Sequence, residues 1–216
     1  AESAEITVLD SLPPTNKTLE WVTLTTASEI LVPTDAWADW DAETQTFIPV
    51  AEGTTAKVKS VVTYPADLYT SVKWHDGSNF SAADVIMGLI LTFDRAKPES
   101  AIYDEAAVPV FESFMSSFKG VKIVSTDPLV VEYYTDLTQP DAENMAISLW
   151  PNYGFGESKW DAIAIGNLAE AAGELAYSTD KATAAQVEWT SYVGGPSLKK
   201  KKKYIDQAAA ESFIPY

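Results

Sequence analysis

The stretch from Val72 to Val85 constrains the local fold most, because it combines a strand end, a tight turn and a complete helix start. The Asp76-Gly77 pair predicts the turn, since both residue types tolerate the positive φ angles that such a reversal needs. The helix is expected to start at Ser81, an N-cap whose capping box is completed by Asp84 at position N3. The stretch therefore predicts a strand, a turn and a helix in succession.

The same residues carry a family resemblance. Trp74-His75-Asp76-Gly77, followed by Phe80 to Val85, resembles the signature of the family 5 extracellular solute-binding proteins. These proteins are the peptide and nickel receptors of ABC importers. The family assignment is a prediction from these motifs.

The resemblance extends to both sides of the signature. Asp35–Asp41 and Ile48–Gly53 are similar to the family's lead-in, with Val50 where Leu is usual. Val121–Tyr134 resembles the family's hairpin, and Tyr192–Ser197 resembles a Gly-Pro-Ser segment of one branch. The match covers about residues 28–150 well and the remainder loosely.

The resemblance implies a receptor lobe with no catalytic activity and no cofactor. Family members hold a solute, an oligopeptide in our expectation, between two lobes and present it to the membrane permease of an ABC importer, in the periplasm or outside the cell. The residues that would brace the lobe are Trp74, His75, Asp76, Gly77, Ser81 and Asp84. Because the family's later Gly-Thr-Gly-Pro-aromatic motif is not found, we expect a fragment that comprises the second lobe.

Length, charge and composition limit the classes of function. A chain of 216 residues buries about 70% of its unfolded surface on folding. Its formal charge of −16 argues against a nucleic-acid partner, because phosphate binding needs clustered Lys and Arg. The absence of cysteine excludes disulfides and Cys-bound zinc. The sequence contains no run of about 20 apolar residues, so it predicts no membrane-spanning helix.

Hydrophobic periodicity predicts a mixture of strands and helices. The expected strands are Glu5–Leu9, Leu19–Thr26, Ala56–Tyr64, Tyr69–Trp74, the hairpin Val121–Ser125 with Leu129–Tyr134, and Val187–Val193. The expected helices are Ala27–Trp40 with an interruption at Pro33, the capped helix up to Ala96, Pro109–Phe118, residues 141–150, Leu168–Ala176 and a helix after Pro196.

These elements predict an α+β fold of mixed helices and antiparallel strands, because they lack regular βαβ spacing. In the resembled family such a fold is one lobe of a periplasmic-binding-protein type II-like structure. Residues 1–195 are expected to form this lobe with part of the hinge. Residues 196–216 are expected to form a C-terminal helix, the truncated remainder of the next segment.

An aromatic stretch punctuated by glycine is the expected ligand contact. Trp150, Tyr153 and Phe155 lie where the resembled family passes from its second lobe toward the hinge. Aromatic side chains in such a loop can stack on a ligand. A buried aromatic corner is the alternative interpretation of the same residues.

The remaining candidate sites favour structural roles. His75 is the only histidine, which excludes multi-histidine metal sites, and its neighbour Asp76 favours a structural hydrogen-bonding pair over catalysis. No metal is expected, because the densest acidic cluster lacks the spacing of an EF-hand and is interpreted as solvated. That cluster comprises Asp35, Asp39, Asp41 and Glu43.

Two other functions remain open. One is a secreted acidic hydrolase, a glycosidase or peptidase, that uses paired carboxylates. The other is a carbohydrate-binding module that uses Trp37, Trp40 and Trp74 as stacking platforms. The run Lys199–Lys203 is interpreted as a solvated helix face, with contact to anionic lipid or nucleic acid as the alternative.

Overall fold

The computed structural model describes residues 1–147 and 159–189. The chain is a mixed α/β protein that forms two compact units. The first unit comprises Ala1–Val72 with Glu112–Pro151, and the second comprises Lys73–Phe111 with Asn152–Tyr216. The domain boundary expected after residue 195 lies outside the described residues.

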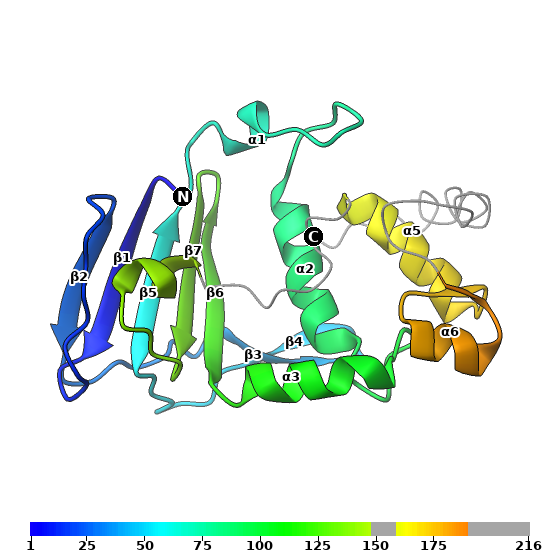
Figure 1. Cartoon of the computed structure of the whole chain (residues 1–216), viewed down its shortest axis with the longest axis horizontal. Helices are drawn as coiled ribbons and strands as arrows, with labels where there is room; N and C mark the ends of the chain where they lie inside the picture. The colour runs from blue at the N-terminus through cyan, green and yellow to red at the C-terminus, as the bar shows by residue number, and fades with distance from the viewer. Residues whose placement is uncertain (148–158, 190–216) are drawn as a thin grey trace. The chain divides into compact units, whose positions relative to one another are not determined.

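A seven-stranded sheet with the order β2-β1-β5-β7-β6-β3-β4 forms the first unit (Figure 1). Its strands are β1 (Ser3–Leu9), β2 (Val22–Ala27), β3 (Trp37–Asp41), β4 (Thr46–Pro49), β5 (Val58–Thr63), β6 (Phe118–Thr126) and β7 (Leu129–Thr135). All pairs are antiparallel except β1 with β2, which is parallel. The unit also contains α1 (Leu68–Ser71) and α4 (Ala142–Ile147), and α4 contacts β1, β2 and β5.

The register of the central strands follows from alternating burial. Ala4, Ile6 and Val8 of β1 are buried, whereas the residues between them are more accessible. Val8 lies opposite Val58 and Ala4 lies opposite Val62 on the antiparallel neighbour β5. A shift by one residue would turn these apolar side chains to the other face, so the pattern fixes the pairing.

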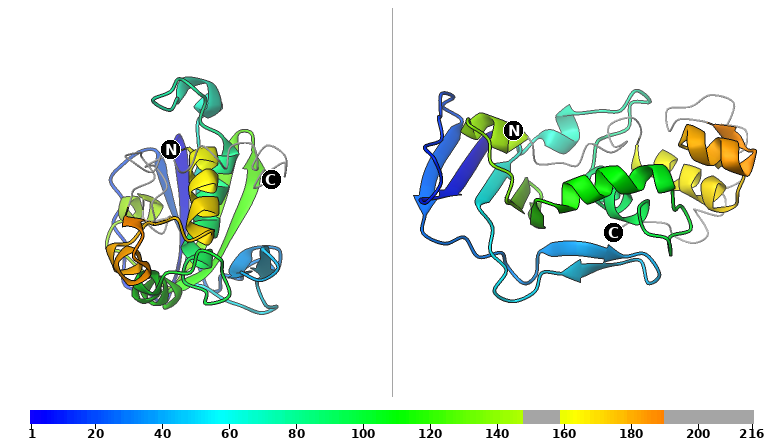
Figure 2. Two further views of the ribbon diagram at one scale, coloured as in Figure 1. Left: turned by 90° about the vertical axis from the view of Figure 1, so that its right-hand side faces the viewer. Right: turned by 60° about the horizontal axis from the view of Figure 1, so that its bottom comes forward.

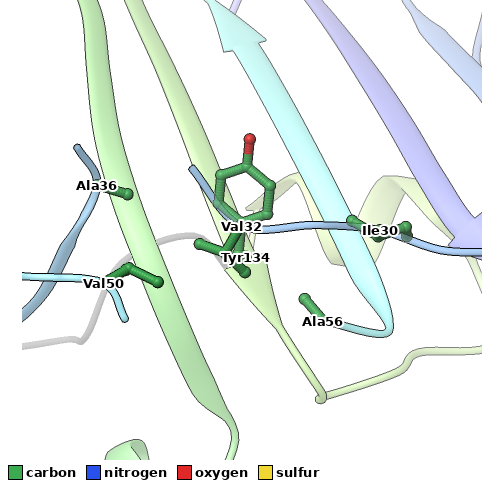
Figure 3. Close-up of a cluster of buried hydrophobic side chains, with 6 residues drawn as sticks. All are labelled: Ile30, Val32, Ala36, Val50, Ala56 and Tyr134. Atoms are coloured by element: carbon green, nitrogen blue, oxygen red, sulfur yellow. The ribbon is translucent and has the colours of Figure 1, made fainter. Parts of the chain in front are cut away.

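Tyr134 of β7 is the largest fully buried side chain among the described residues, and it lies in an apolar cluster of the first unit. The other members are Ile30, Val32, Ala36, Val50 and Ala56 (Figure 3). The Tyr134 hydroxyl donates to Glu132 Oε2 at 2.7 Å, and burial raises the pKa of the Tyr134 phenol. Gly120 faces this cluster so closely that a Cβ there would be 2.9 Å from Val32 Cγ1.

The second unit is mainly helical. Its elements are α2 (Ala82–Asp94), the 3₁₀ helix η1 (Glu105–Ala107), α5 (Trp160–Ala171), α6 (Thr179–Ala185) and the parallel strands β8 (Leu175–Ala176) and β9 (Glu188–Trp189). Met87 and Leu91 of α2 pack with Ile163 and Ala164 of α5 in one buried cluster. Helix α3 (Val108–Met115) begins in the second unit and ends in the first.

Several predictions based on local signals are confirmed. Helix α2 starts after the predicted N-cap Ser81, and the hairpin of β6 and β7 forms where the sequence placed it. The peptide bond between Asp127 and Pro128 in this hairpin is cis. None of the helices within the described residues combines the length and the apolar character needed to cross a bilayer.

The helix predicted for Ala27–Trp40 is wrong, because none of this stretch is helical and its last four residues belong to strand β3. Trp37 and Trp40 are 8% and 5% exposed, and β3 pairs with β4 and, at Trp37, with Val121 of β6. The β3–β4 hairpin turns away from the other strands of the first unit (Figure 2). Burial and pairing with distant strands therefore outweigh the local helical pattern.

Two further elements were predicted wrongly. The strand expected at Tyr69–Trp74 is not formed, because its first three residues belong to the short helix α1, which follows a turn in which Leu68 N–H donates to Pro65 O at 3.0 Å. The helix expected at Leu168–Ala176 starts earlier, at Trp160, and ends before Gly173. Gly173 has a φ of +69°, a conformation that glycine adopts readily and that stops the helix before β8.

Candidate functional site

The three expected ligand contacts, Trp150, Tyr153 and Phe155, lie outside the described residues, as does Lys199–Lys203. The six signature residues are all described. They lie in the second unit, in the hairpin before α2 and at the start of α2. We use the name signature region for Lys73–Asp84 together with Lys159 and Trp160 at the start of α5.

The turn predicted at Asp76-Gly77 is confirmed as a three-residue loop. Trp74 N–H donates to Ser78 O at 2.9 Å, and Gly77 N–H donates to Trp74 O at 2.9 Å. Gly77 has a φ of +83°, which an L side chain rarely adopts, so this position requires glycine. The pattern is that of a hairpin loop closed by a glycine bulge.

The hydrogen bond expected between His75 and Asp76 is not formed. Asp76 Oδ1 instead accepts from the N–H of Ser78 at 2.8 Å and from its hydroxyl at 2.6 Å, because the tight turn brings Ser78 back over the carboxylate. The Ser78 hydrogen bonds lower the pKa of Asp76, with smaller contributions from Lys159 and His75. His75 is exposed and has no role in closing the turn through a hydrogen bond.

Asp84 joins the starts of two helices. Its Oδ2 accepts from the N–H of Ser81 at 2.8 Å and from the Ser81 hydroxyl at 3.0 Å, within the predicted capping box of α2. Its Oδ1 accepts from the N–H of Trp160, the first residue of α5, at 2.9 Å. The hydrogen bond to Trp160 could not be predicted from the sequence, because Asp84 and Trp160 are 76 positions apart.

Lys159 is the cation of the signature region that lies among carboxylates. Its Nζ lies 2.8 Å from Asp161 Oδ2, and this hydrogen bond is the main cause of the raised pKa of Lys159. Asp76 and Asp84 raise the same pKa through their charges. The hairpin, the start of α2 and the start of α5 thus contribute carboxylates around one ammonium group.

The tryptophans proposed as carbohydrate platforms do not form an exposed surface. Trp37 and Trp40 are buried and stack on each other with ring centroids 5.8 Å apart. Trp74 is half-buried beside Phe80, at 6.2 Å between ring centroids. The Trp74 Nε1 is buried and has no hydrogen-bond partner within residues 1–147 and 159–189. Stacking on a sugar needs an accessible ring face, so we do not retain this function.

The acidic cluster near β3 is engaged in local structure. Asp41 Oδ1 accepts from the N–H groups of Glu43 and Thr44 at 3.0 and 2.9 Å, and Asp35 Oδ2 lies 2.6 Å from Lys122 Nζ. These bonds lower the pKa values of Asp41 and Asp35. In the described part of the chain, no three His, Cys, Asp or Glu residues are grouped so that they could hold a metal.

A buried ion cluster in the second unit was not predicted. Arg95 Nη2 lies 3.1 Å from Asp104 Oδ2 and 3.5 Å from Glu170 Oε1, and Lys181 Nζ lies 3.2 Å from the same Glu170 oxygen. The side chains of Arg95, Asp104 and Glu170 are 7%, 4% and 0% exposed. The Arg95 guanidinium also lies 5.6 Å from the centre of the Tyr177 ring.

The two buried carboxylates of the cluster are stabilised to different degrees. Glu170 lies near the C-terminal end of α5, where the helix dipole disfavours a negative charge. Its Oε2 is buried and has no hydrogen-bond partner among the described residues. Burial opposes ionisation of Asp104, but hydrogen bonds from Ser178, Ala106 and Arg95 outweigh it and lower the pKa of Asp104. Among the described residues, Arg95 is the cation that pairs with both buried carboxylates, whereas Lys181 pairs with Glu170 alone.

No protein-family model matches the chain, and a comparison with curated proteins likewise finds no match. The family resemblance of the signature region therefore remains a prediction.

Replacing Asp84 with Ala is expected to destabilise the second unit by about 2 kcal/mol, because the first N–H groups of α2 and α5 lose their common acceptor. Urea unfolding measures the loss, and amide hydrogen exchange should show reduced protection at Ser81 and Trp160. Asp161→Ala is the matched control, since this carboxylate is also at the start of α5 but is 44% exposed. Equal effects of the two substitutions would contradict the double-capping role.

Proposed function

We propose that the chain binds a small solute, with an oligopeptide as the first candidate, as one lobe of a family 5 solute-binding protein. Such a receptor delivers its ligand to the permease of an ABC importer at the cell envelope. The lobe would belong to a type II-like periplasmic-binding fold. The observation that carries the proposal is the signature region, in which Trp74, Gly77, Ser81 and Asp84 take structural positions in a hairpin and a capped helix.

The signature region supports binding by fixing the start of the helix that follows the expected contacts in the chain. Trp150, Tyr153 and Phe155 precede α5 in the chain, and Asp84 holds the first residue of that helix. The hydrogen bond from Trp160 N–H to Asp84 restricts the backbone at the start of α5. Less conformational entropy of the chain is then lost when a ligand binds. Closure of two lobes around a solute would then stabilise the conformation that the permease recognises.

Titration with mixed short peptides, followed by NMR chemical shifts, tests the proposal. We expect peptides to bind weakly, because a single lobe supplies few contacts, and we expect no peptide hydrolysis. Trp150→Ala, Tyr153→Ala and Phe155→Ala should each weaken binding about tenfold. Trp189→Ala is the control, since this tryptophan is 60% exposed and lies outside the expected contacts.

Three results would count against the proposal. Release of cleaved peptide or glycoside would favour the hydrolase, whose paired carboxylates could then be sought by single substitutions. If Trp189→Ala and Trp150→Ala weaken binding equally, the expected contact residues are wrong. If millimolar peptide causes no chemical-shift change, the chain does not bind oligopeptides.

A further inference from the structure

The two edges of the seven-stranded sheet are protected to different degrees. Edge strands present unpaired backbone groups, and proteins usually block them with charges, prolines, bulges or short length. Strand β4 is blocked in several of these ways, because it has four residues, ends at Pro49 and pairs with β3 through a register shift between Trp37 and Asp39. No additional strand can extend easily along this edge.

Strand β2, at the opposite edge, has none of these protections. Its six residues contain neither a charge nor a proline, and they pair with β1 in register from Val22 to Ala27 without a bulge. Within the described residues β1 is the only strand that pairs with β2 (Figure 1). Thr23, Thr25 and Thr26 are exposed. As far as the described residues show, the edge is therefore regular and uncharged, and three of its six side chains are exposed.

The backbone pairing shows which groups of β2 face outward. Ala4 N–H donates to Trp21 O at 3.0 Å and Asp10 N–H donates to Ala27 O at 2.9 Å, so the odd-numbered residues direct their backbone groups to β1. Successive residues of a strand point to alternate sides. The N–H and C=O groups of Leu24 and Thr26 therefore point away from β1.

Contacts within the first unit hold this edge in place. Glu143 of α4 accepts from the N–H groups of Thr18 and Leu19 at 2.5 and 2.6 Å, which fixes the segment that leads into β2. On the strand itself, the hydroxyls of Thr7 and Thr25 lie 3.1 Å apart across the parallel pair. A partner strand would meet a preformed template and would not have to order it.

We propose that the β2 edge binds an extended, cationic peptide segment of a partner by adding it to the sheet as a further strand. Exposed carboxylates flank the edge at both ends, with Glu20 before β2 and Glu29 after it. The first unit as a whole carries five Lys and 17 Asp or Glu, which gives a formal charge of −12. Strand addition supplies backbone hydrogen bonds, and terminal Lys or Arg residues would meet the flanking carboxylates.

A second copy of the chain fits this edge less well. Pairing two β2 edges would bring together two units of like charge, and like-charge juxtaposition opposes association. The exposed threonine side chains match a partner rich in β-branched residues, because such residues pack well across strands. The partner segment is thus extended, β-branched in its middle and basic at its ends.

The test uses the full chain labelled with ¹⁵N and two synthetic peptides. Lys-Thr-Val-Thr-Val-Lys should bind and shift the backbone amides of Leu24 and Thr26, whereas Glu-Thr-Val-Thr-Val-Glu should not. Replacing Thr26 with Pro removes an outward N–H and leaves the bonds to β1 intact, so affinity should fall about threefold to tenfold. Thr23→Val is the matched control, since it changes an exposed side chain of β2 without removing a backbone donor.

A reversal of charge keeps the test decisive if Thr26→Pro perturbs the strand. With Glu20→Lys and Glu29→Lys together, the basic peptide should lose its advantage over the acidic peptide, because the carboxylates that flank the edge are replaced by ammonium groups. Trp150→Ala should leave the shifts at Leu24 and Thr26 unchanged, which separates this edge from the proposed solute site. Absence of these shifts with the basic peptide, equal binding of both peptides, or concentration-dependent self-association through β2 would overturn the proposal.

Discussion

Replacing Arg95 with Ala is expected to destabilise the second unit by about 3–5 kcal/mol, because two buried carboxylates then lose their common cation. Lys181 cannot compensate, since it reaches only Glu170 and is 24% exposed. Urea unfolding followed by hydrogen exchange in α2, α5 and α6 measures the loss. Lys181→Ala is the comparison and should cost less than Arg95→Ala, because Lys181 contacts one of the two carboxylates and is itself 24% exposed.

A double substitution separates the cost of an unpaired charge from the value of the pair. Arg95→Met combined with Glu170→Leu removes both charges and keeps similar volume, so most of the lost stability should return. Asp104 still has its hydrogen bond from the Ala106 N–H at 3.1 Å in that variant. If Arg95→Ala costs no more than Lys181→Ala, the cluster does not hold the unit together.

The same cluster gives the second unit a defined pH dependence. The pKa of Asp104 is lowered in the folded state, so its ionised form stabilises the fold above the ordinary value of 3.8. This contribution is lost as the pH falls from 3.8 through the lower folded pKa. In Arg95→Ala the loss on acidification should be smaller, because part of the lowering has already been removed.

Replacing Tyr134 with Ala is expected to destabilise the first unit by about 3–5 kcal/mol, since a large aromatic side chain is lost from a closed cluster. Tyr134→Phe should cost about 1 kcal/mol, because it removes only the hydrogen bond to Glu132. Chemical denaturation with hydrogen exchange at β5 and β7 distinguishes this unit from the second.

Val124→Ala is the control for Tyr134. Val124 is in the same sheet but is 50% exposed, so its truncation should change stability by no more than about 0.5 kcal/mol. Similar effects at Val124 and Tyr134 would mean that the cluster around Tyr134 does not carry the stability of the sheet.

The predictable parts of this structure are those in which the signal and its partner are close in sequence. Ser81 and Asp84 are three residues apart, and they specify the start of α2 without help from the rest of the chain. The Asp76-Gly77 turn and the β6–β7 hairpin are local in the same sense. The identity of the turn-closing donor, Ser78 in place of His75, depends on geometry that the residue types alone do not specify.

The unpredicted parts depend on partners that are distant in sequence. Trp37 belongs to a strand because it lies opposite Val121, and this pairing overrides a helical pattern around Pro33. The ion cluster brings Arg95 next to Glu170, and no local sequence motif links these two residues, which are 75 positions apart. The expected ligand contacts, Trp150, Tyr153 and Phe155, lie outside the described residues and stay a prediction.

The chain passes between the two units three times, after Val72, Phe111 and Pro151. In the sheet, β5 pairs with both β1 and β7. Strand β7 comprises residues 129–135, so it is synthesised well after β5. During translation at about 5–20 residues per second, β5 therefore waits several seconds with one edge open. During this interval the ribosome completes α2, which belongs to the other unit. The early chain thus has a second open edge at β5, in addition to β2, and binding of a chaperone at β5 should decline once β7 has emerged from the ribosome.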